Sequence, residues 1–347
     1  MFEFLKQIGS LGYDIAIDLG TKNTLVYIDK KGIVINEPSV VAINTKTTEI
    51  LEIGFEAKKM VGKTPAHIQA IKPLVNGVIS DFEITEKMLK HFINKVHGEG
   101  FSFLPRPRVI IGIPLDITEV EKKAVKDAAK SAGARKVYLI EEAMASALGA
   151  GLPVDSPRAN MIVDIGGGTT DIAVISLAGV VSWKSLRIAG NELDNNIIDY
   201  VRDKFNVLIG EQLAEKIKIN LASVIPFDED RSMEIRGRDL TNGLPTAIII
   251  TDVQVREAIK KTIIKIIENI KLALEETPPE LVGDIYEHGL FLSGGGALLY
   301  GFDKLIAKAT KIPVVVVEDP LTAMVRGAGS LFADEELLKK ITSVLDL

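Results

Sequence analysis

Two short segments of this sequence combine an aspartate with glycines and threonines in an order that suits phosphate binding. Residues 159–177 read ANMIVDIGGGTTDIAVISL, so an apolar strand runs into Asp164, three glycines and two threonines before a second apolar strand begins. Glycines lack a Cβ and let backbone N–H groups approach an anion, and threonine hydroxyls add further donors. Asp164 can hold a hydrated cation beside the phosphate. We therefore predict a phosphate-binding hairpin here.

The same pattern occurs near the N-terminus. Residues 13–28 read YDIAIDLGTKNTLVYI, with Asp18 in the place of Asp164. The two aspartates are 146 positions apart (164 minus 18), a separation typical of two homologous domains and too long for a short repeat. The chain therefore looks internally duplicated, with two hairpins facing one nucleotide.

A third glycine cluster, LSGGGALL at 292–299, follows an apolar strand at 289–292 and precedes an expected helix. Its amides and a helix N-terminus suit a phosphate or the attached nucleoside. One glycine run alone is more often a tight turn, but three strand–glycine elements together favour nucleotide binding. The sequence contains neither a Walker-type GxxxxGK[ST] segment nor a GxGxxG after a strand, which argues against those two classes of nucleotide-binding fold.

These three segments resemble the phosphate 1, phosphate 2 and adenosine motifs of the actin, Hsp70 and sugar-kinase superfamily. Within it, the sequence looks most similar to the MreB family of bacterial actins. The similarity extends from the first residues to about residue 328. Besides the glycine segments, it is carried by DIAIDLGTKNT at 14–24, NEPSVV at 36–41, NGVISDF at 76–82, LGAGLP at 148–153 and TPPEL at 277–281.

The resemblance implies an α/β fold with duplicated actin-like (ribonuclease H-like) core domains, each a mixed sheet flanked by helices, and two smaller inserted subdomains. The expected boundaries are 1–34, 72–147 and 332–347 for the first core domain, 35–71 for its insertion, 148–188 and 251–331 for the second core domain, and 189–250 for its insertion.

Local patterns predict elements between the motifs. Thr118 and Glu121 form a capping box for a helix that ends at Gly133, between strands at 109–113 and 136–140. Strand, helix and strand with short connections indicate a parallel layer covered by helices.

Three further helices are expected. Thr251 and Gln254 open a long helix over 252–276, in which Ile263, Ile264, Ile266, Ile267 and Ile270 form a wide apolar face for core packing. An alanine-rich helix over 140–150 links the two halves and suits a hinge. A charged amphipathic helix over 333–347 would, by resemblance, return to the first domain.

The resemblance also assigns roles around the nucleotide. Asp18 and Asp164 would reach Mg²⁺ through waters that the ion retains. Glu215 and Lys218, three apart on one helix face, would contact the ribose and adenine, although an exposed ion pair would give the same pattern. The residues expected to clamp the phosphates are Gly20, Thr21, Lys22, Asn23, Gly166, Gly167, Gly168 and Thr169, and those completing the adenosine pocket are Gly294, Gly295 and Gly296.

For ATP hydrolysis, the resemblance points to Glu142, with Thr169, as the residues that position the attacking water. From the residues alone, Glu142 and its neighbour Glu141 would both be read as solvated carboxylates at a helix N-terminus. Two positions depart from the usual family pattern. Ala143 stands where a proline often follows the glutamate, which would loosen the turn that aims Glu142, and Asp171 stands where a glutamate often closes the hairpin.

Two apolar segments suggest contact with a membrane surface. The N-terminal MFEFLKQI can form a short amphipathic helix, and a loop flanked by GEG and PRPR exposes large apolar residues beside two arginines. Packing of either segment on the protein itself is the alternative, but the resemblance implies a membrane-inserting loop near the second. The residues concerned are Phe2, Phe4, Phe101, Phe103 and Leu104.

Composition limits the alternatives. The 347 residues include no cysteine, which excludes disulfides and thiolate metal sites and fits a reducing compartment such as the cytoplasm. A net charge of -6 with interspersed signs gives no broad basic field, so nucleic acid is not an expected partner. No apolar run approaches the roughly 20 residues that span a bilayer.

We therefore expect an ATP-binding and hydrolysing bacterial actin homologue that needs Mg²⁺. Closure of two domains on Mg-ATP would favour head-to-tail addition of subunits into filaments. By resemblance, the filaments would lie on the inner face of the cytoplasmic membrane and, with cell-wall synthesis proteins, maintain rod shape.

The alternative is a small-molecule kinase of the sugar or acetate type in the same superfamily, which would need a base beside a polar substrate pocket. An Hsp70-type chaperone would need a substrate-binding domain after about residue 340, which the sequence does not contain.

Overall fold

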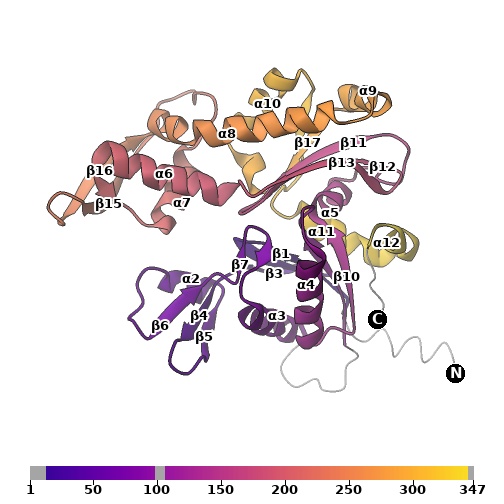
Figure 1. Cartoon of the computed structure of the whole chain (residues 1–347), viewed down its shortest axis with the longest axis horizontal. Coiled ribbons are helices and arrows are strands. Elements are labelled where there is room, and N and C mark those ends of the chain that lie inside the picture. The colour runs from indigo at the N-terminus through magenta and orange to yellow at the C-terminus, as the bar shows by residue number, and fades with distance from the viewer. Residues whose placement is uncertain (1–12, 98–105, 343–347) are drawn as a thin grey trace.

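Two five-stranded sheets of matching topology lie at the centre of the molecule, shown by a computed structural model that describes residues 13–97 and 106–342 (Figure 1). The first core sheet contains β1 (Ile15–Leu19), β2 (Asn23–Ile28), β3 (Gly32–Pro38), β9 (Arg108–Ile113) and β10 (Lys136–Glu141), in the order β10-β9-β1-β2-β3. The second contains β11 (Asn160–Ile165), β12 (Thr170–Ser176), β13 (Gly179–Leu186), β17 (Leu290–Ser293) and β18 (Val314–Val316), in the order β13-β12-β11-β17-β18.

The two core sheets are built in the same way. In each, three consecutive strands pair antiparallel, and two later strands continue the sheet in parallel from the first of them. The turn between the first two strands holds residues 20–22 in one sheet and 166–169 in the other, which are the two predicted phosphate segments. The repeated topology agrees with the duplication and confirms the expected fold class.

Helices α3 (Phe82–His97) and α4 (Glu119–Ser131) cover one face of the first core sheet and share a hydrophobic core with it. The predicted capping box of α4 is present: the Thr118 backbone N–H donates to Glu121 over 2.8 Å, and the Glu121 N–H donates to the Thr118 hydroxyl. The helix stops before Gly133, whose φ of +115° is unfavourable for other residues.

The second core sheet is covered by α8 (Asp252–Glu275), α9 (Pro279–His288) and α10 (Phe302–Thr310). The capping box of Thr251 and Gln254 at the start of α8 is confirmed. Four of the five isoleucines expected on its apolar face are buried, but Ile264 is 43% exposed. That prediction was wrong because each helical residue turns by about 100°, which places position 264 beyond the edge of the stripe.

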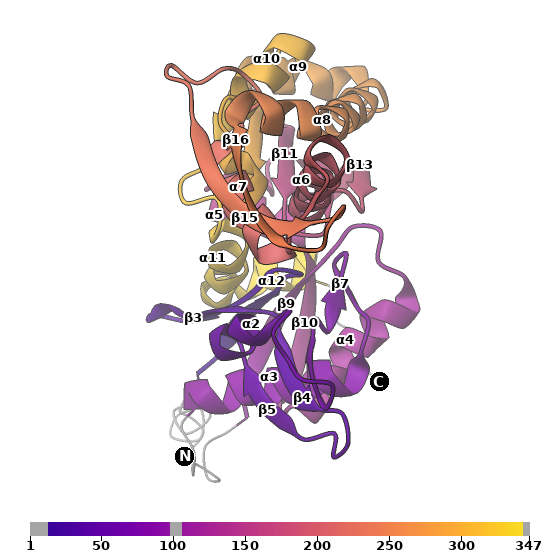
Figure 2. The ribbon, with the colours of Figure 1, turned by 90° about the vertical axis from the view of Figure 1, so that its left-hand side faces the viewer.

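Helices α5 (Glu142–Gly149) and α11 (Ala323–Ser330) lie between the two core sheets (Figure 2). Their buried residues form one core with apolar residues of both sheets, such as Ile110 and Ile162. The alanine-rich helix begins later than predicted, since Ile140 and Glu141 still pair with β9. This shared core joins the two halves, where the sequence suggested a hinge.

Small residues bring α5 and α11 unusually close together. A Cβ on Gly149 would overlap the carbonyl of Ala323, and a Cβ on Gly327 would overlap that of Ala145. Only glycine therefore fits at these two positions of the crossing.

The last described helix contacts the first half. After η2 (Leu331–Ala333), the short helix α12 (Glu335–Ile341) buries Leu338 and Ile341 in the core between the sheets, and Glu335 pairs with Arg108 of β9 over 3.0 Å. The helix expected over 333–347 begins at Glu335 and ends at Ile341, and the last five positions of that expectation lie outside the described residues.

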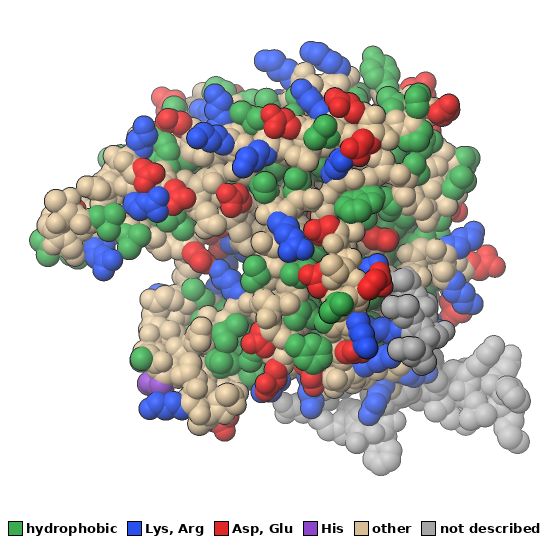
Figure 3. All heavy atoms as spheres, viewed as in Figure 1, with side chains coloured by type: hydrophobic (Ala, Val, Ile, Leu, Met, Phe, Trp, Pro, Cys, Tyr) green, Lys and Arg blue, Asp and Glu red, His purple; other side chains and the backbone are tan. Residues whose placement is uncertain are grey.

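Two smaller sheets extend from the core. The first outer sheet, β4 (Val41–Asn44), β5 (Ile50–Ile53) and β6 (Ile68–Ile71), packs against α2 (Phe55–Met60). The second outer sheet, β14 (Val207–Leu208), β15 (Ser232–Asp239) and β16 (Pro245–Thr251), lies with α6 (Gly190–Phe205) and α7 (Glu211–Leu221). The surface is hollowed between these two parts (Figure 3).

The residues predicted to contact lipid, Phe2, Phe4, Phe101, Phe103 and Leu104, lie outside the described residues. Among the helices of the described part of the chain, none is long and apolar enough to cross a membrane.

Candidate nucleotide-binding site

The two predicted phosphate turns meet. A Cβ on Gly168 would lie 2.5 Å from the hydroxyl oxygen of Thr21, and a Cβ on Gly167 would overlap the side chain of Lys22. The turns at 20–22 and 166–169 therefore pack directly against each other, and only glycine permits this approach. The structure thus brings together two segments that the sequence related only by pattern.

The N-terminus of helix α6 is hydrogen-bonded to the second phosphate turn. The backbone N–H groups of Gly190 and Asn191 donate to the carbonyls of Gly166 and Gly167 over 3.2 and 2.8 Å. Within the turn, the Gly166 N–H donates to the Thr169 carbonyl over 2.9 Å. A turn fixed in this way loses little conformational freedom when it binds an anion.

A hairpin formed by β7 (Leu74–Val75) and β8 (Val78–Ile79) packs on both turns. Its tip residues Asn76 and Gly77 have φ of +49° and +78°, as a two-residue hairpin requires. The Gly77 N–H donates to the Thr21 hydroxyl over 2.9 Å, and a Cβ on Gly168 would lie 2.8 Å from the Asn76 Cα. The Asn-Gly pair is a strong sequence signal for such a turn, but nothing in the sequence places it at the phosphate turns.

Asp18 and Asp164 occupy matching positions near the ends of β1 and β11. The Ser146 hydroxyl of α5 donates to the Asp164 carboxylate. Burial nevertheless raises the pKa of Asp164 to about 6, with the hydrogen bonds from Ser146 and Ser293 opposing the rise. Burial and then the charge of Asp164 raise the pKa of Asp18 to about 7. The two carboxylates are therefore close enough to repel each other, and a cation between them would relieve both charges.

These carboxylates fit a hydrated Mg²⁺. In the described residues, no group of three or more His, Cys, Asp or Glu side chains is arranged to hold a metal ion directly. Mg²⁺ usually keeps several waters and takes one or two carboxylates together with substrate phosphates. Asp18 and Asp164 beside the phosphate turns match that donor set.

Glu142 is the first residue of α5 and belongs to the same acidic group. Burial raises the pKa of its carboxyl well above its usual range, and the charges of Asp171, Asp18 and Asp164 add to the rise. Its neighbour Glu141 instead ends β10, where it pairs with Ile113. The two glutamates, equivalent in the sequence pattern, therefore have different surroundings.

The third glycine segment packs against the end of β11. Gly294, with φ of +77°, donates its N–H to the Pro320 carbonyl over 2.9 Å, and a Cβ there would lie 2.5 Å from a carboxylate oxygen of Asp164. A Cβ on Gly296 would overlap Ile165, and one on Gly295 would lie 3.3 Å from Leu321. Gly295 and Gly296 begin a 3₁₀ turn, η1 (Gly295–Leu298). The α-helix that the sequence predicts after this segment, α10, begins only at Phe302.

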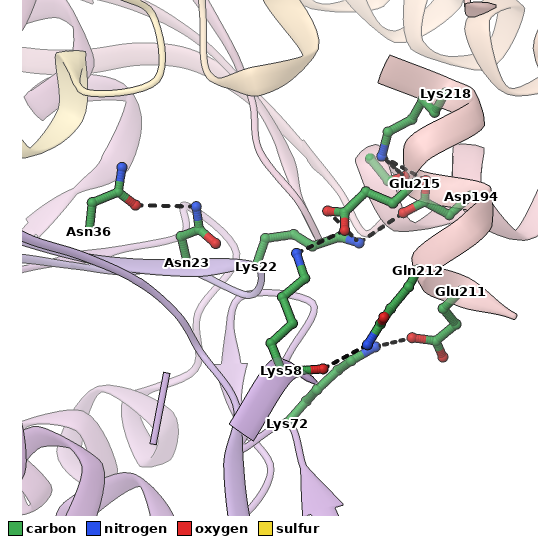
Figure 4. A network of polar contacts seen from close by, with 11 residues as sticks. Lys22, Asn23, Asn36, Lys58, Lys72, Asp194, Glu211, Gln212, Glu215 and Lys218 are labelled. Atoms are coloured by element: carbon green, nitrogen blue, oxygen red, sulfur yellow. Dashed lines mark hydrogen bonds and ion pairs between the residues drawn. The ribbon is translucent and has the colours of Figure 1, made fainter. Parts of the chain in front are cut away.

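Glu215 and Lys218 project from α7 toward other parts of the chain (Figure 4). Glu215 pairs with Lys58 over 2.9 Å and with Lys22 over 3.5 Å. Lys218 pairs with Asp194 over 2.8 Å and donates to the Gly190 carbonyl over 2.9 Å. The sequence also allowed an exposed ion pair between Glu215 and Lys218. In the structure, these two side chains instead pair with residues outside α7.

Lys22 and Asn23, which were also predicted to clamp the phosphates, have side chains that bind elsewhere. The Lys22 ammonium lies 2.8 Å from a carboxylate oxygen of Asp194 on α6. The Asn23 amide donates to the Asn36 side chain over 3.3 Å. In this structure, the backbone of the turn and the Thr21 hydroxyl face the second turn, while the Lys22 head group faces α6 and α7.

Comparison with known proteins decides the family. The family model described as MreB/Mbl protein matches residues 12–340. The chain belongs to the MreB/Mbl family. It is 50% identical over 325 residues to the cell shape-determining protein MreB of Escherichia coli (strain K12), covering 92% of this chain and 93% of that protein.

Solved structures agree with membership of the MreB/Mbl family. The crystal structure of MreB5 of Spiroplasma citri bound to ADP is 38% identical, with a TM-score of 0.89 over 95% of this chain and 98% of that one. The MamK double helical filament, 23% identical with a TM-score of 0.78 over 93% and 99%, shows the fold alone. The chain is therefore an actin homologue, and the kinase alternative is not supported.

Sequence reasoning missed several residues at the mouth of this site in the MreB/Mbl-family chain. Four of them are charged residues and one is a glutamine, and no local pattern in the sequence links them to the glycine turns. The residues are Lys58, Lys72, Asp194, Glu211 and Gln212.

Proposed function

We propose that this MreB/Mbl-family chain binds ATP with Mg²⁺ between its two phosphate turns and hydrolyses it slowly. The observation that carries the proposal is the meeting of the turns at Gly168 and Thr21, with Asp18 and the buried Asp164 beside them. Spiroplasma citri MreB5, which shares this fold, has been crystallised with ADP and with AMPPNP. Both ligands are adenine nucleotides, which supports ATP as the substrate.

The phosphates would be held by backbone N–H groups of Gly20, Gly166, Gly167 and Gly168 and by the hydroxyls of Thr21 and Thr169. A bound Mg²⁺ would neutralise the β and γ phosphates. Glu215 and Lys218 would face the ribose and base, and the segment from Gly294 to Gly296 would close the adenosine side.

Glu142 would position the attacking water and accept its proton, with Thr169 as a second positioning group. A general base works best when its pKa lies near the working pH. Burial among acidic side chains raises the pKa of the Glu142 carboxyl well above its usual range. Binding of a divalent cation nearby would lower it again and leave the carboxylate ionised when the substrate is present.

Filament formation is the second part of the proposal. Head-to-tail contacts between identical subunits extend without closing, and closure of the two halves on nucleotide would favour them. The family has an Escherichia coli relative named a cell shape-determining protein, which supports a role in cell shape. We propose that the polymer acts by organising cell-wall synthesis together with wall-synthesis proteins. We place the polymer in the cytoplasm at the inner face of the cell membrane, with Phe2, Phe4, Phe101, Phe103 and Leu104 as the lipid contacts.

Negative-stain electron microscopy tests this function. The purified chain is applied to anionic lipid monolayers with Mg-ATP, and to the same lipid with EDTA and no nucleotide. Filaments on lipid only with Mg-ATP are the expected result. Single particles under both conditions, across a range of salt concentrations, would contradict the proposed polymer.

A further inference from the structure

Two ion pairs cross the hollow between the outer sheets (Figure 4). On one side, Lys58 projects from α2 and Lys72 directly follows β6. On the other side, Glu211 and Glu215 lie one turn apart on α7. Lys58 pairs with Glu215 over 2.9 Å, and Lys72 pairs with Glu211. The two pairs join parts of the chain that are 157 and 139 positions apart.

A direct hydrogen bond strengthens this connection. The side-chain amide of Gln212, between the two glutamates in sequence, donates to the Lys58 carbonyl over 2.6 Å. The backbone of α2 and the side chains of α7 are therefore in contact, so the two halves touch at this point as well as through α5 and α11.

The crossing lies next to the candidate nucleotide site. The residues of the two ion pairs and Gln212 line one pocket together with Thr21 and Lys22 of the first phosphate turn. Glu215, the residue proposed to contact the ribose, belongs to both features. The ion pairs therefore line the same pocket as the first phosphate turn.

The charges around Glu215 favour the paired state. Burial opposes ionisation, but the hydrogen bond from Lys58 and the charges of Lys22 and Lys58 hold the pKa of Glu215 below its usual range. Burial likewise opposes the charge of Lys22, and Asp194 together with Glu215 outweighs it and raises the Lys22 pKa. The Glu215 carboxylate of the inner pair, Lys58 with Glu215, is therefore held in its charged form. The outer pair is Lys72 with Glu211. Its glutamate is more exposed than Glu215, so the outer pair should be the weaker of the two.

We propose that Lys58 and Lys72 are positioning residues that hold the cleft closed over the bound nucleotide and slow its release. This inference rests on the proposed function. Neither lysine is among the proposed nucleotide contacts; each acts through a glutamate of α7. Opening the cleft separates both pairs at once, and the pair of Lys72 with Glu211 involves none of the proposed nucleotide contacts. The rate of release, and its dependence on salt, should therefore change more than the chemistry.

Exchange of the two charges of the outer pair tests the proposal. The release of a fluorescent ADP analogue is followed by stopped flow after mixing with excess unlabelled ATP and Mg²⁺. Lys72→Glu and Glu211→Lys each place like charges across the cleft, and each should speed release by on the order of threefold. The double variant restores opposite charges and should return the rate to within about twofold of the unaltered protein.

Salt dependence and a matched variant separate this role from a structural one. Release from the unaltered protein should accelerate as the ionic strength rises, because salt screens exposed pairs, and the single variants should lose most of that dependence. Lys63→Glu changes the net charge equally at an exposed lysine of the same outer segment and should leave the rate unchanged.

The outcomes that overturn the proposal are distinct from failure of the proposed function. Single variants that release the analogue at the unaltered rate, or a double variant that stays fast, would show that the pairs do not hold the cleft closed. If the unaltered protein binds no fluorescent nucleotide, the proposed function fails and this inference fails with it.

Discussion

Asp164 and Asp171 stand directly opposite each other in the antiparallel pair of β11 and β12. Directly opposed residues project from the same face of a sheet, and like charges in this arrangement are destabilising. Asp171 is 1% exposed, and burial raises its pKa to about 7; the charge of Asp164 adds to the rise, and the Leu115 N–H, which donates to Asp171 over 3.4 Å, opposes it. The phosphate hairpin therefore carries two buried acids on one face.

This relationship predicts a pH-dependent cost to stability. The ordinary pKa of Asp171 is 3.8 and its value in the folded chain is about 7. Between these pH values the folded chain holds a proton that the unfolded chain has lost, so the free energy of unfolding falls as the pH rises through that window. Asp171→Asn removes this cost. Its gain in unfolding temperature, measured in EDTA without nucleotide, should be small near pH 4.5 and largest near pH 8.

Asp228→Asn provides the control, because Asp228 is exposed and lies outside the acidic group around Asp164. It should change the unfolding temperature by a similar small amount at both pH values. A gain for Asp171→Asn that does not depend on pH, or a loss of stability at pH 8, would contradict the assignment of a buried charge penalty to Asp171.

The different surroundings of Glu142 and Glu141 predict different kinetic effects. Glu142→Ala removes the proposed water-positioning carboxylate and should slow phosphate release from ATP by about a hundredfold, the lower end of the usual effect of a general base. Affinity for ATP should change little. Glu141→Ala removes the neighbouring carboxylate at the end of β10 and should leave turnover close to that of the unaltered protein. Equal effects of the two substitutions on phosphate release would count against Glu142.

The crossing of α5 and α11 predicts a sharp penalty for one added methyl group. Gly327→Ala places a Cβ against the Ala145 carbonyl and should lower the free energy of unfolding by about 2 kcal/mol or more. Gly283→Ala, in α9 with open space around its Cβ position, should instead raise it by up to about 1 kcal/mol because alanine favours helix. Urea denaturation of both variants measures the difference, and comparable stability of the two would show that the crossing relaxes easily.

Short-range signals explain which parts of the structure were predictable. The capping boxes at Thr118 and Thr251 depend on residues three apart, and both are present. The two phosphate turns repeat a pattern of aspartate, glycine and threonine between strands, and the fold class followed from that repeat together with the family resemblance. The positions of the helix ends were less certain: strand pairing with β9 extends through Glu141 and delays the start of α5.

Long-range contacts explain what the sequence left out. Glu215 and Lys218 fit an ion pair on one helix face, yet each pairs with lysines or an aspartate far away in the chain. Lys58 is an ordinary charge on a six-residue helix, and only the folded chain places it against Glu215. Pairing across a cleft depends on how two domains meet, which no spacing within one element records.

Calorimetric titration of the chain with Mg-ATP measures whether the two glycine turns together bind the phosphates. The unaltered protein should bind one nucleotide. Gly168→Ala forces a Cβ against Thr21 and Asn76 and should weaken binding by on the order of tenfold or more, whereas the Gly283→Ala control should bind like the unaltered protein. Absence of binding by the unaltered protein, or equal affinity for Gly168→Ala, would contradict the account.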